Sequence, residues 1–170
     1  MKYIEFEEID STNTYIHDHY QELDDDTIVR AHYQTHGRGR SNHIWEADKN
    51  EQLLFSYYMK QNVDPLKVSA IMAYAIVTVL RMKQINAFIK WPNDILYNGK
   101  KMVGILTEMS AEMDAINYVV IGMGINVNID AADFPPVRYH GGAADLLHHF
   151  RKRAHSEQHR HVRRQIRPRY

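Results

Sequence analysis

A cationic stretch in the first third of the chain is the clearest candidate for chemistry. In HGRGRSNHIWEADK, residues 36–49, Arg38 and Arg40 alternate with glycine, and Trp45 and Lys49 follow. Guanidinium groups match the geometry of carboxylates and phosphates, and lysine adds a point charge. An indole ring offers a flat face on which a base can stack. These residue types point to a loop that holds an anion.

The two glycines of this loop fit the same interpretation. Gly37 and Gly39 allow backbone conformations that other residues resist, and they let the chain lie against a ligand. The alternative is a solvated turn that carries surface charge. The chain has no GxxxxGK[ST] P-loop. The stretch is not a Rossmann fingerprint either, because no third glycine follows and it opens no helix.

A lysine inside an aromatic strand is a second candidate. FIKWPND, residues 88–94, reads as a short strand that Pro92 ends. A regular strand places Lys90 on the same face as Phe88. Lys90 then either extends to water at an edge of the sheet or faces a pocket. In a pocket its ammonium group would suit an anionic ligand.

The strand NYVVIGMGINVN, residues 117–128, has two unlike faces. One set of alternate residues is continuously apolar, and the other contains Gly122, Gly124 and Asn126. Glycine weakens a strand, so two glycines on one face indicate that something approaches the backbone closely. A ligand, a bulge or a closely packed helix would each account for them. The amide of Asn126 offers a donor and an acceptor beside this face.

Regular elements must hold these residues in place. Alternating apolar residues predict strands, and capping residues predict helices. The Asn-Gly pair at 98–99 is the strongest short hairpin signal. The expected strands cover 2–9, 26–34, 52–60, 87–91, a hairpin over 95–109, and 117–128. The expected helices run from a cap at 10–12 to about 21, and from Asp64-Pro65 to about 83. This order favours an α+β fold with a largely antiparallel sheet.

Composition narrows the class of protein. The 170 residues include 44% hydrophobic and 25% charged residues, which fits one soluble domain with a proper core. Cysteine is absent, so neither a disulfide framework nor a thiolate metal site is expected. The eleven histidines form no HExxH and no paired metal spacing. The longest apolar run, 13 residues within the second predicted helix, is too short for a membrane span. No signal peptide is recognisable, so a cytoplasmic location is expected.

The net charge of zero hides an asymmetry. Residues 138–170 contain nine Lys or Arg and two Asp or Glu, a balance of 9 − 2 = +7. The apolar periodicity also fades there. We interpret residues 136–170 as a basic His- and Arg-rich tail that is non-native, through truncation or an altered reading frame, or disordered. An arm that binds nucleic acid is the third and least favoured interpretation.

Five motifs together resemble the catalytic domain of the biotin protein ligases, also called biotin–[acetyl-CoA-carboxylase] ligases. They are DSTN at 10–13, QTHGRGR at 34–40 with Trp45, KWPNDIL at 90–96, GKKMVGIL at 99–106 and VIGMGINVN at 120–128. Their order and spacing are those of the family. The resemblance covers residues 1–135. It implies a fold like that of class II aminoacyl-tRNA synthetases, a mixed sheet backed by helices.

The resemblance also implies an activity. Enzymes of this family join the carboxylate of biotin to the α-phosphate of ATP and release pyrophosphate. A lysine of a biotin carboxyl carrier domain then attacks the biotinyl-adenylate. The first nucleophile is already ionised, so it needs no general base. Cationic groups and Mg²⁺ would align the two anions and stabilise the charge.

Residue roles follow from the resemblance in the same way. Biotin would be bound by Ser11, Thr12, Asn13, Gln34, Gly37, Arg38, Lys90 and Gly104. ATP would be bound by Arg40, Trp45, Lys49, Lys90 and Asn126. Lys90 would bridge the carboxylate and the α-phosphate as the main catalytic cation, while Arg38 and Arg40 close over both groups. Lys101 would also line the pocket, and no metal site built by the protein is expected.

Two departures from the family pattern affect the expected activity. The loop commonly continues with another basic residue, and His43 stands there, which would weaken phosphate binding. Residues 136–170 match nothing in the family's C-terminal region, which normally adds helices and a small β-barrel. Both departures would lower the activity of this chain.

Three other functions stay open. A lipoate–protein ligase shares the fold, although the QTHGRGR and KWPND motifs favour biotin. A catalytically impaired fragment could hold biotin or its adenylate without turnover. A nucleic-acid binder would use the basic tail. No membrane partner is expected, nucleic acid is not favoured, and a homodimer is left open.

Overall fold

The computed structural model describes residues 1–46, 51–61, 63–112 and 115–128 of the chain. Lys49, residues 129–135 of the expected catalytic domain and the whole tail, residues 136–170, lie outside the described residues. The expectations for these segments stay predictions.

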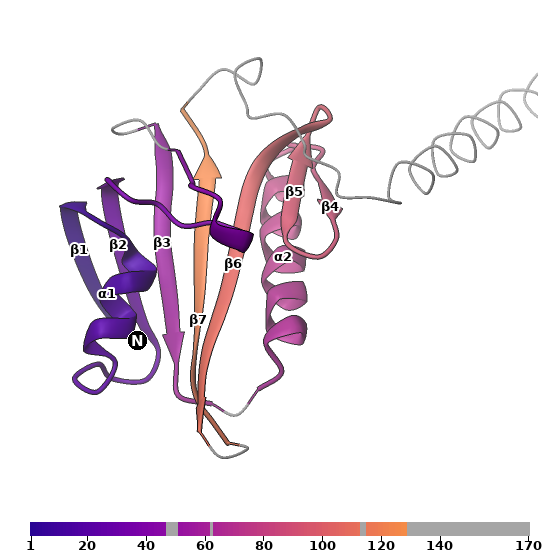
Figure 1. Ribbon diagram of the computed structural model, residues 1–170. Coiled ribbons are helices and arrows are strands. Elements are labelled where there is room, and N and C mark those ends of the chain that lie inside the picture. Colours follow the sequence, from indigo (N-terminus) through magenta and orange to yellow (C-terminus); the bar gives the residue numbers. More distant parts are fainter. Residues whose placement is uncertain (47–50, 62, 113–114, 129–170) are drawn as a thin grey trace, which may run out of the picture. The chain divides into compact units, whose positions relative to one another are not determined.

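A seven-stranded sheet with the order β1-β2-β3-β7-β6-β5-β4 forms the centre of the described fold (Figure 1). The strands are β1 (Lys2–Ile9), β2 (Thr27–Gln34), β3 (Gln52–Met59), β4 (Phe88–Lys90), β5 (Asp94–Tyr97), β6 (Lys100–Glu112) and β7 (Ala115–Asn126). β1 and β2 are parallel, and the other neighbouring pairs are antiparallel. The predicted mixed, largely antiparallel sheet is confirmed.

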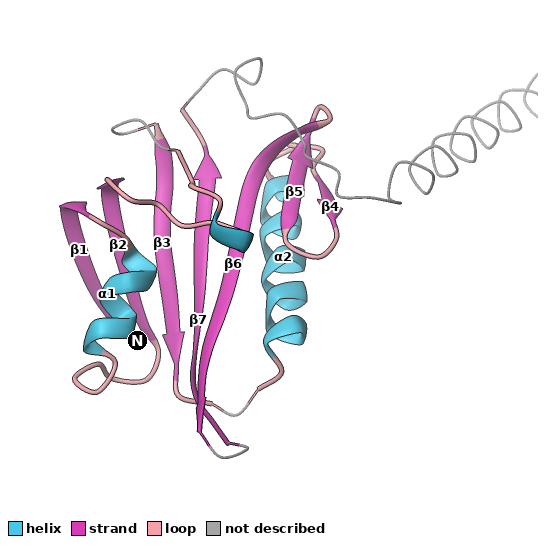
Figure 2. Ribbon diagram, viewed as in Figure 1, coloured by secondary structure: helices cyan, strands magenta, loops and turns pink. Residues whose placement is uncertain are grey.

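Two helices lie on opposite faces of this sheet (Figure 2). Helix α1 (Thr12–His19) begins after Ser11, whose hydroxyl accepts a hydrogen bond from the backbone N–H of Thr14. Helix α2 (Pro65–Met82) begins after Asp64, which caps the backbone N–H of Leu66. Both start signals were therefore interpreted correctly, and α1 ends two residues before its expected end.

The alternation of β7 separates two cores. On one face Val120 packs with Ile16 of α1, and on the other Ile121 packs with Ala73 and Val77 of α2. Because a strand directs successive side chains to opposite faces, one strand anchors both helices. The glycines of β7 share the α1 face, and this face carries the site.

The predicted hairpin joins β5 to β6. Asn98 and Gly99 have φ values of 50° and 77°, the left-handed conformations that a tight hairpin turn of this kind requires. β6 then pairs with β7, and Gly104 lies directly opposite Gly124 in that register. Gly104 of β6 and Gly124 of β7 therefore lie side by side at the centre of the sheet.

Helix α2 differs from one expectation. It has 18 residues and a mean hydropathy of 1.4, so its length and composition are sufficient for a membrane span, although its apolar run seemed too short. Core helices of soluble proteins meet the same criterion. The buried face of α2, formed by Ser69, Ala73 and Val77, packs on the sheet.

Candidate functional site

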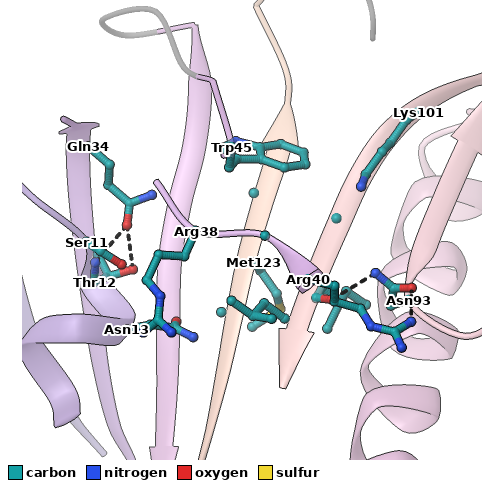
Figure 3. Close-up of a pocket in the computed structure, with 16 residues that line it drawn as sticks. Ser11, Thr12, Asn13, Gln34, Arg38, Arg40, Trp45, Asn93, Lys101 and Met123 are labelled. Atoms are coloured by element: carbon teal, nitrogen blue, oxygen red, sulfur yellow. Dashed lines mark hydrogen bonds between the residues drawn. The ribbon is translucent and has the colours of Figure 1, made fainter. Parts of the chain in front are cut away.

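A pocket opens on the α1 face of the sheet, beneath the loop that follows β2 (Figure 3). The space within it is about 450 Å³ including its open mouth. Its polar and charged lining residues are Ser11, Thr12, Asn13, Gln34, Arg38, Arg40, Trp45, Asn93 and Lys101. Among the described residues that line it, every charged side chain is a cation.

Buried hydroxyl and amide groups form one side of the pocket. The backbone N–H of Thr12 donates to Gln34 Oε1 at 2.7 Å, and Thr12 Oγ1 lies 2.6 Å from Ser56 Oγ. Ser11, Thr12 and Ser56 are almost fully buried, and Gln34 is 9% exposed. The start of α1 and the end of β2 therefore present a fixed set of neutral hydrogen-bonding groups.

Asn13 extends this set across β7. Its side chain lies against Gly122, where an added Cβ would overlap the Asn13 amide. Ser56 donates to Asn13 Oδ1, and Asn13 Nδ2 donates to Glu108 at 2.8 Å. Gly122 is thus required by the position of a protein side chain.

Trp45 covers the paired glycines of β6 and β7. A Cβ on Gly104 or on Gly124 would overlap the indole ring. The indole Nε1 donates to Gln52 Oε1 at 2.8 Å, and Lys101 Nζ lies 5.3 Å from the ring centroid. The prediction that something approaches the glycine face closely is correct, and the groups that do so are Trp45 and Asn13.

The cationic loop closes on itself. Arg38 and Ile44 form a β-bridge, and the backbone N–H of Trp45 donates to the carbonyl of Gly37 at 2.9 Å. A Cβ on Gly37 would overlap the Trp45 carbonyl oxygen. The expectation that the loop glycines serve unusual φ values is wrong, because Gly99 is the glycine with positive φ among the described residues. Gly37 is needed for close approach within the loop.

The two loop arginines reach opposite parts of the site. Arg38 Nη2 donates to Glu108 Oε1 at 2.7 Å, and Arg40 Nη1 donates to Asn93 Oδ1 at 2.9 Å. Arg38 and Arg40 both line the pocket. His43, also in the loop, is exposed and does not line it.

The two lysines of the motifs meet at one carboxylate. Lys101 lines the pocket, and its Nζ lies 2.9 Å from Asp94 Oδ1. Lys90 is not among the lining residues, and its Nζ lies 3.5 Å from Asp94 Oδ2. One carboxylate therefore holds both lysines, and only Lys101 borders the space that a ligand would occupy.

Asn126 is fully buried on the glycine face of β7, two residues beyond Gly124. Its Nδ2 donates to the carbonyl of Lys101 at 3.2 Å, whereas its Oδ1 is one of the few buried acceptors without a partner in the described part of the chain. Buried polar atoms are normally paired, so an unsatisfied oxygen marks a place where a donor can bind. Asn126 does not itself line the pocket.

Glu108 and Asp94 were missed as site residues, because both read as ordinary surface or supporting carboxylates. Their side chains are 21% and 13% exposed, and each pairs with a cation that lines the pocket. The alternation of β6 offered a signal for Glu108, since it shares a face with Gly104 and Leu106. No comparable sequence signal indicated that Asp94 holds two lysines.

The environment of Glu108 favours its charged form. Burial alone would raise the pKa of the Glu108 carboxyl, but hydrogen bonds from His17 and Asn13 and the charge of Arg38 outweigh it. The pKa therefore lies below its ordinary value.

A pH-dependent stability follows for E108Q. At pH 7 the variant should lower the free energy of unfolding by about 1–3 kcal/mol, because it weakens hydrogen bonds to a charged group. A carboxylate with a lowered folded-state pKa stabilises the fold above its ordinary pKa of 4.5, and this contribution is lost as the pH falls through the lowered value. Urea unfolding at neutral pH and at about pH 3 measures this contribution. If the difference in the free energy of unfolding between E108Q and the wild type did not shrink in acid, the lowered pKa of Glu108 would be contradicted.

The arrangement suits an anionic ligand with a polar, uncharged end. Arg40 and Lys101 lie on one side of the pocket, and Arg38 lies beside the neutral groups of α1 and β2 on the other (Figure 3). The lining offers no carboxylate among the described residues, so it presents no group of the usual kind for a general base or a metal ligand.

Comparisons with known proteins identify the family of the chain. Residues 5–126 match the model of the biotin/lipoate A/B protein ligase family. The "Bifunctional ligase/repressor BirA" of Bacillus subtilis is 43% identical over 113 residues, which are 64% of this chain and 35% of that protein. The "Biotin--[acetyl-CoA-carboxylase] ligase" of Mycobacterium tuberculosis is 29% identical over 111 residues, 61% of this chain and 40% of that protein. The chain thus spans between a third and two fifths of these relatives.

A solved structure supports the fold. The biotin protein ligase from Aquifex aeolicus in complex with biotin and ATP superposes with a TM-score of 0.67 and 25% identity. The match covers 80% of this chain and 58% of that one. The expected likeness to a biotin protein ligase catalytic domain, and with it the class II synthetase-like fold, is confirmed.

Proposed function

Because the chain belongs to the biotin/lipoate A/B protein ligase family, we propose that it activates biotin with ATP and transfers it to a lysine of a carrier domain. The observation that carries this proposal is the composition of the pocket lining. Arg40 and Lys101 border one side of it, and buried hydroxyl and amide groups, with Arg38 beside them, border the other (Figure 3). A ligand with a carboxylate at one end and a neutral ring with donors and acceptors at the other would match both parts.

The first step would join two anions. An oxygen of the biotin carboxylate attacks the α-phosphorus of ATP, the bond from that phosphorus to the bridging oxygen of the β-phosphate breaks, and pyrophosphate leaves. The nucleophile carries its negative charge from the start, so no proton has to be removed. The protein's task is to bring the two groups together and stabilise the charge that develops.

Lys101 is the cation that we assign to the reacting groups. It lines the pocket, and its contact with Asp94 fixes its position from behind. Lys90, to which the sequence assigned this role, would act through the shared Asp94 carboxylate. Arg38 would hold the biotin carboxylate from the loop, and Arg40 would hold the phosphates.

The adenine would lie near Trp45 and β7. The indole is held against the glycine pair by its bond to Gln52, so its outer face is available for stacking. The unpaired Oδ1 of Asn126 would accept a hydrogen bond from the adenine amino group. This second contact requires the base to reach further along β7 than the present pocket lining does.

Mg²⁺ would enter with ATP. The described residues contain no cluster of His, Cys, Asp or Glu that could hold a metal ion, and both oxygens of Asp94 face lysines. A protein-built magnesium site therefore does not fit these residues. Phosphates commonly supply the ligands of Mg²⁺ in nucleotide sites, and the residue roles proposed above involve no metal.

The second step would use a partner protein. The ε-amino group of a carrier lysine attacks the acyl carbon of the adenylate, the acyl–phosphate bond breaks, AMP leaves and the amine loses a proton. We propose a biotin carboxyl carrier domain as this partner and the cytoplasm as the location, and a homodimer stays open.

Biotin-dependent exchange of labelled pyrophosphate into ATP tests the proposal. The full chain should catalyse exchange with biotin and not with lipoate. Exchange with lipoate alone would make it a lipoate ligase. Tight biotin binding without exchange would identify a binding fragment, and exchange without labelling of a carrier domain would limit the activity to the first step.

A further inference from the structure

Glu108 of β6 joins three side chains that are far apart in the sequence. Its Oε1 accepts from Arg38 Nη2 at 2.7 Å, and its Oε2 accepts from Asn13 Nδ2 at 2.8 Å. Oε2 also lies 3.3 Å from His17 Nε2. Glu108 does not line the pocket, whereas Arg38 and Asn13 do. It can therefore influence a ligand only through its partners.

The pair of donors requires a carboxylate. Arg38 and the amide nitrogen of Asn13 can only donate, and each needs an acceptor oxygen. An ionised glutamate offers two such oxygens, one for each partner. A glutamine at position 108 would offer one oxygen and one NH₂ group, so it would have to release either Arg38 or Asn13.

The charge on Glu108 also sets the direction of the hydrogen bonds behind it. Because Asn13 must turn Nδ2 toward Glu108, its Oδ1 faces Ser56 and accepts from the Ser56 hydroxyl. Ser56 Oγ can then accept from the Thr12 hydroxyl, 2.6 Å away. Gln34 Oε1 accepts from the Thr12 backbone N–H at 2.7 Å and lies 3.0 Å from Thr12 Oγ1, so the start of α1 sets its orientation independently of Glu108. The amide nitrogen of Gln34 is left as a donor.

His17 supports Glu108 from the side away from the pocket. Its Nδ1 lies 2.8 Å from the hydroxyl of Tyr118. Burial raises the pKa of Tyr118, so the phenol keeps its proton and can donate to Nδ1. With Nδ1 as the acceptor, Nε2 of His17 carries a proton and donates it to Glu108. All three partners of the carboxylate are donors.

We propose that Glu108 is the positioning residue of the biotin subsite, which holds Asn13 and Arg38 in place and fixes the donor and acceptor directions of Asn13 and Ser56. A ureido ring has both N–H donors and a carbonyl acceptor, so its affinity depends on these directions. The inference rests on the proposed function, because biotin is taken as the ligand of this side of the pocket.

Steady-state pyrophosphate exchange by the full chain tests the role of Glu108. In E108Q the KM for biotin should rise roughly 10- to 100-fold, the effect of disturbing hydrogen bonds to a charged group. The KM for ATP should stay within about twofold, since Trp45 and Arg40 do not contact Glu108. A fall in kcat with both KM values unchanged would overturn the proposal.

A charge-swapped pair provides a rescue. N13D alone places two carboxylates against each other and should also raise the biotin KM. In the double variant N13D/E108Q, the new carboxylate still accepts from Ser56, and the new amide donates to it while accepting from Arg38. The double variant should therefore bind biotin more tightly than N13D. Absence of this recovery would contradict the role of Glu108 even if E108Q alone did not fold.

E22Q is the matched control. Glu22 also pairs with a histidine, His19, at 3.6 Å, but its side chain is 80% exposed and it lies outside the pocket. Its biotin KM should equal that of the wild type. A wild-type chain with no biotin-dependent exchange and no biotin binding would overturn the proposed function. If the wild type catalysed pyrophosphate exchange normally and E108Q had the same KM for biotin, only the positioning role of Glu108 would be overturned.

Discussion

Replacing Lys101 with methionine is expected to slow formation of the biotinyl-adenylate by roughly 10²- to 10³-fold, the usual cost of removing one group that stabilises developing charge. Lys101 is the lysine that lines the described pocket, and Asp94 holds its ammonium group at 2.9 Å. Methionine keeps the length and apolar stem of the side chain and removes the charge. Binding of biotin alone should weaken much less, because the neutral end of the ligand is held elsewhere.

Single-turnover measurements of adenylate formation separate the chemical step from binding. K100M is the matched control, since Lys100 is the neighbouring residue on β6 and does not line the pocket. K90A should have an effect of about tenfold, because its influence passes through Asp94. A large loss in K90A with little change in K101M would restore the role that the sequence assigned to Lys90 and remove that of Lys101.

The substitutions G122A and G124A are expected to weaken different ligands, although they lie two residues apart on one face of β7. A Cβ on Gly124 would overlap the Trp45 indole and move it from the sheet. G124A should therefore raise the KM for ATP roughly 10- to 100-fold, because base–aromatic stacking contributes about 1–3 kcal/mol. A Cβ on Gly122 would overlap the Asn13 amide instead. G122A should raise the KM for biotin by a similar factor.

Each variant serves as the control for the other. Both add one methyl group to the same strand, so a general loss of stability would affect the two ligands alike in both. Tryptophan fluorescence gives an independent measurement in a W91F background, where Trp45 is the remaining tryptophan. Its emission should shift in G124A and stay as in the parent in G122A. Equal effects of both variants on both ligands would show that the glycines do not divide the site in this way.

Much of the fold could be predicted from local patterns. The caps at Ser11 and Asp64, the Asn98-Gly99 turn and the alternation of β7 act over a few residues, so the sequence displays them directly. The two glycines of β7 correctly indicated a close approach to the backbone. Their partners could not be identified, because Asn13 and Trp45 reach β7 from elements distant in the sequence.

The cationic residues also separate into features that the sequence displayed and contacts that only the folded chain makes. The sequence indicated a cationic anion site from the types of its residues, and Arg38 and Arg40 do line the pocket. The resemblance assigned the main catalytic role to Lys90 and a place in the pocket lining to Lys101. It could not show that both lysines meet one carboxylate, because the register of β5 between β4 and β6 is what places Asp94 beside them.

The sequence by itself determined the family, the elements and the chemical character of the site, because motifs, caps and periodicity are local properties of the chain. Only the tertiary structure decided which polar groups face one another. Glu108 illustrates the reason: its partners lie 70, 91 and 95 residues away, and neither carboxylate chemistry nor strand alternation specifies them. The contact of Trp45 of the cationic loop with Gly104 and Gly124 likewise depends on the pairing of β6 with β7, which the sequence does not display.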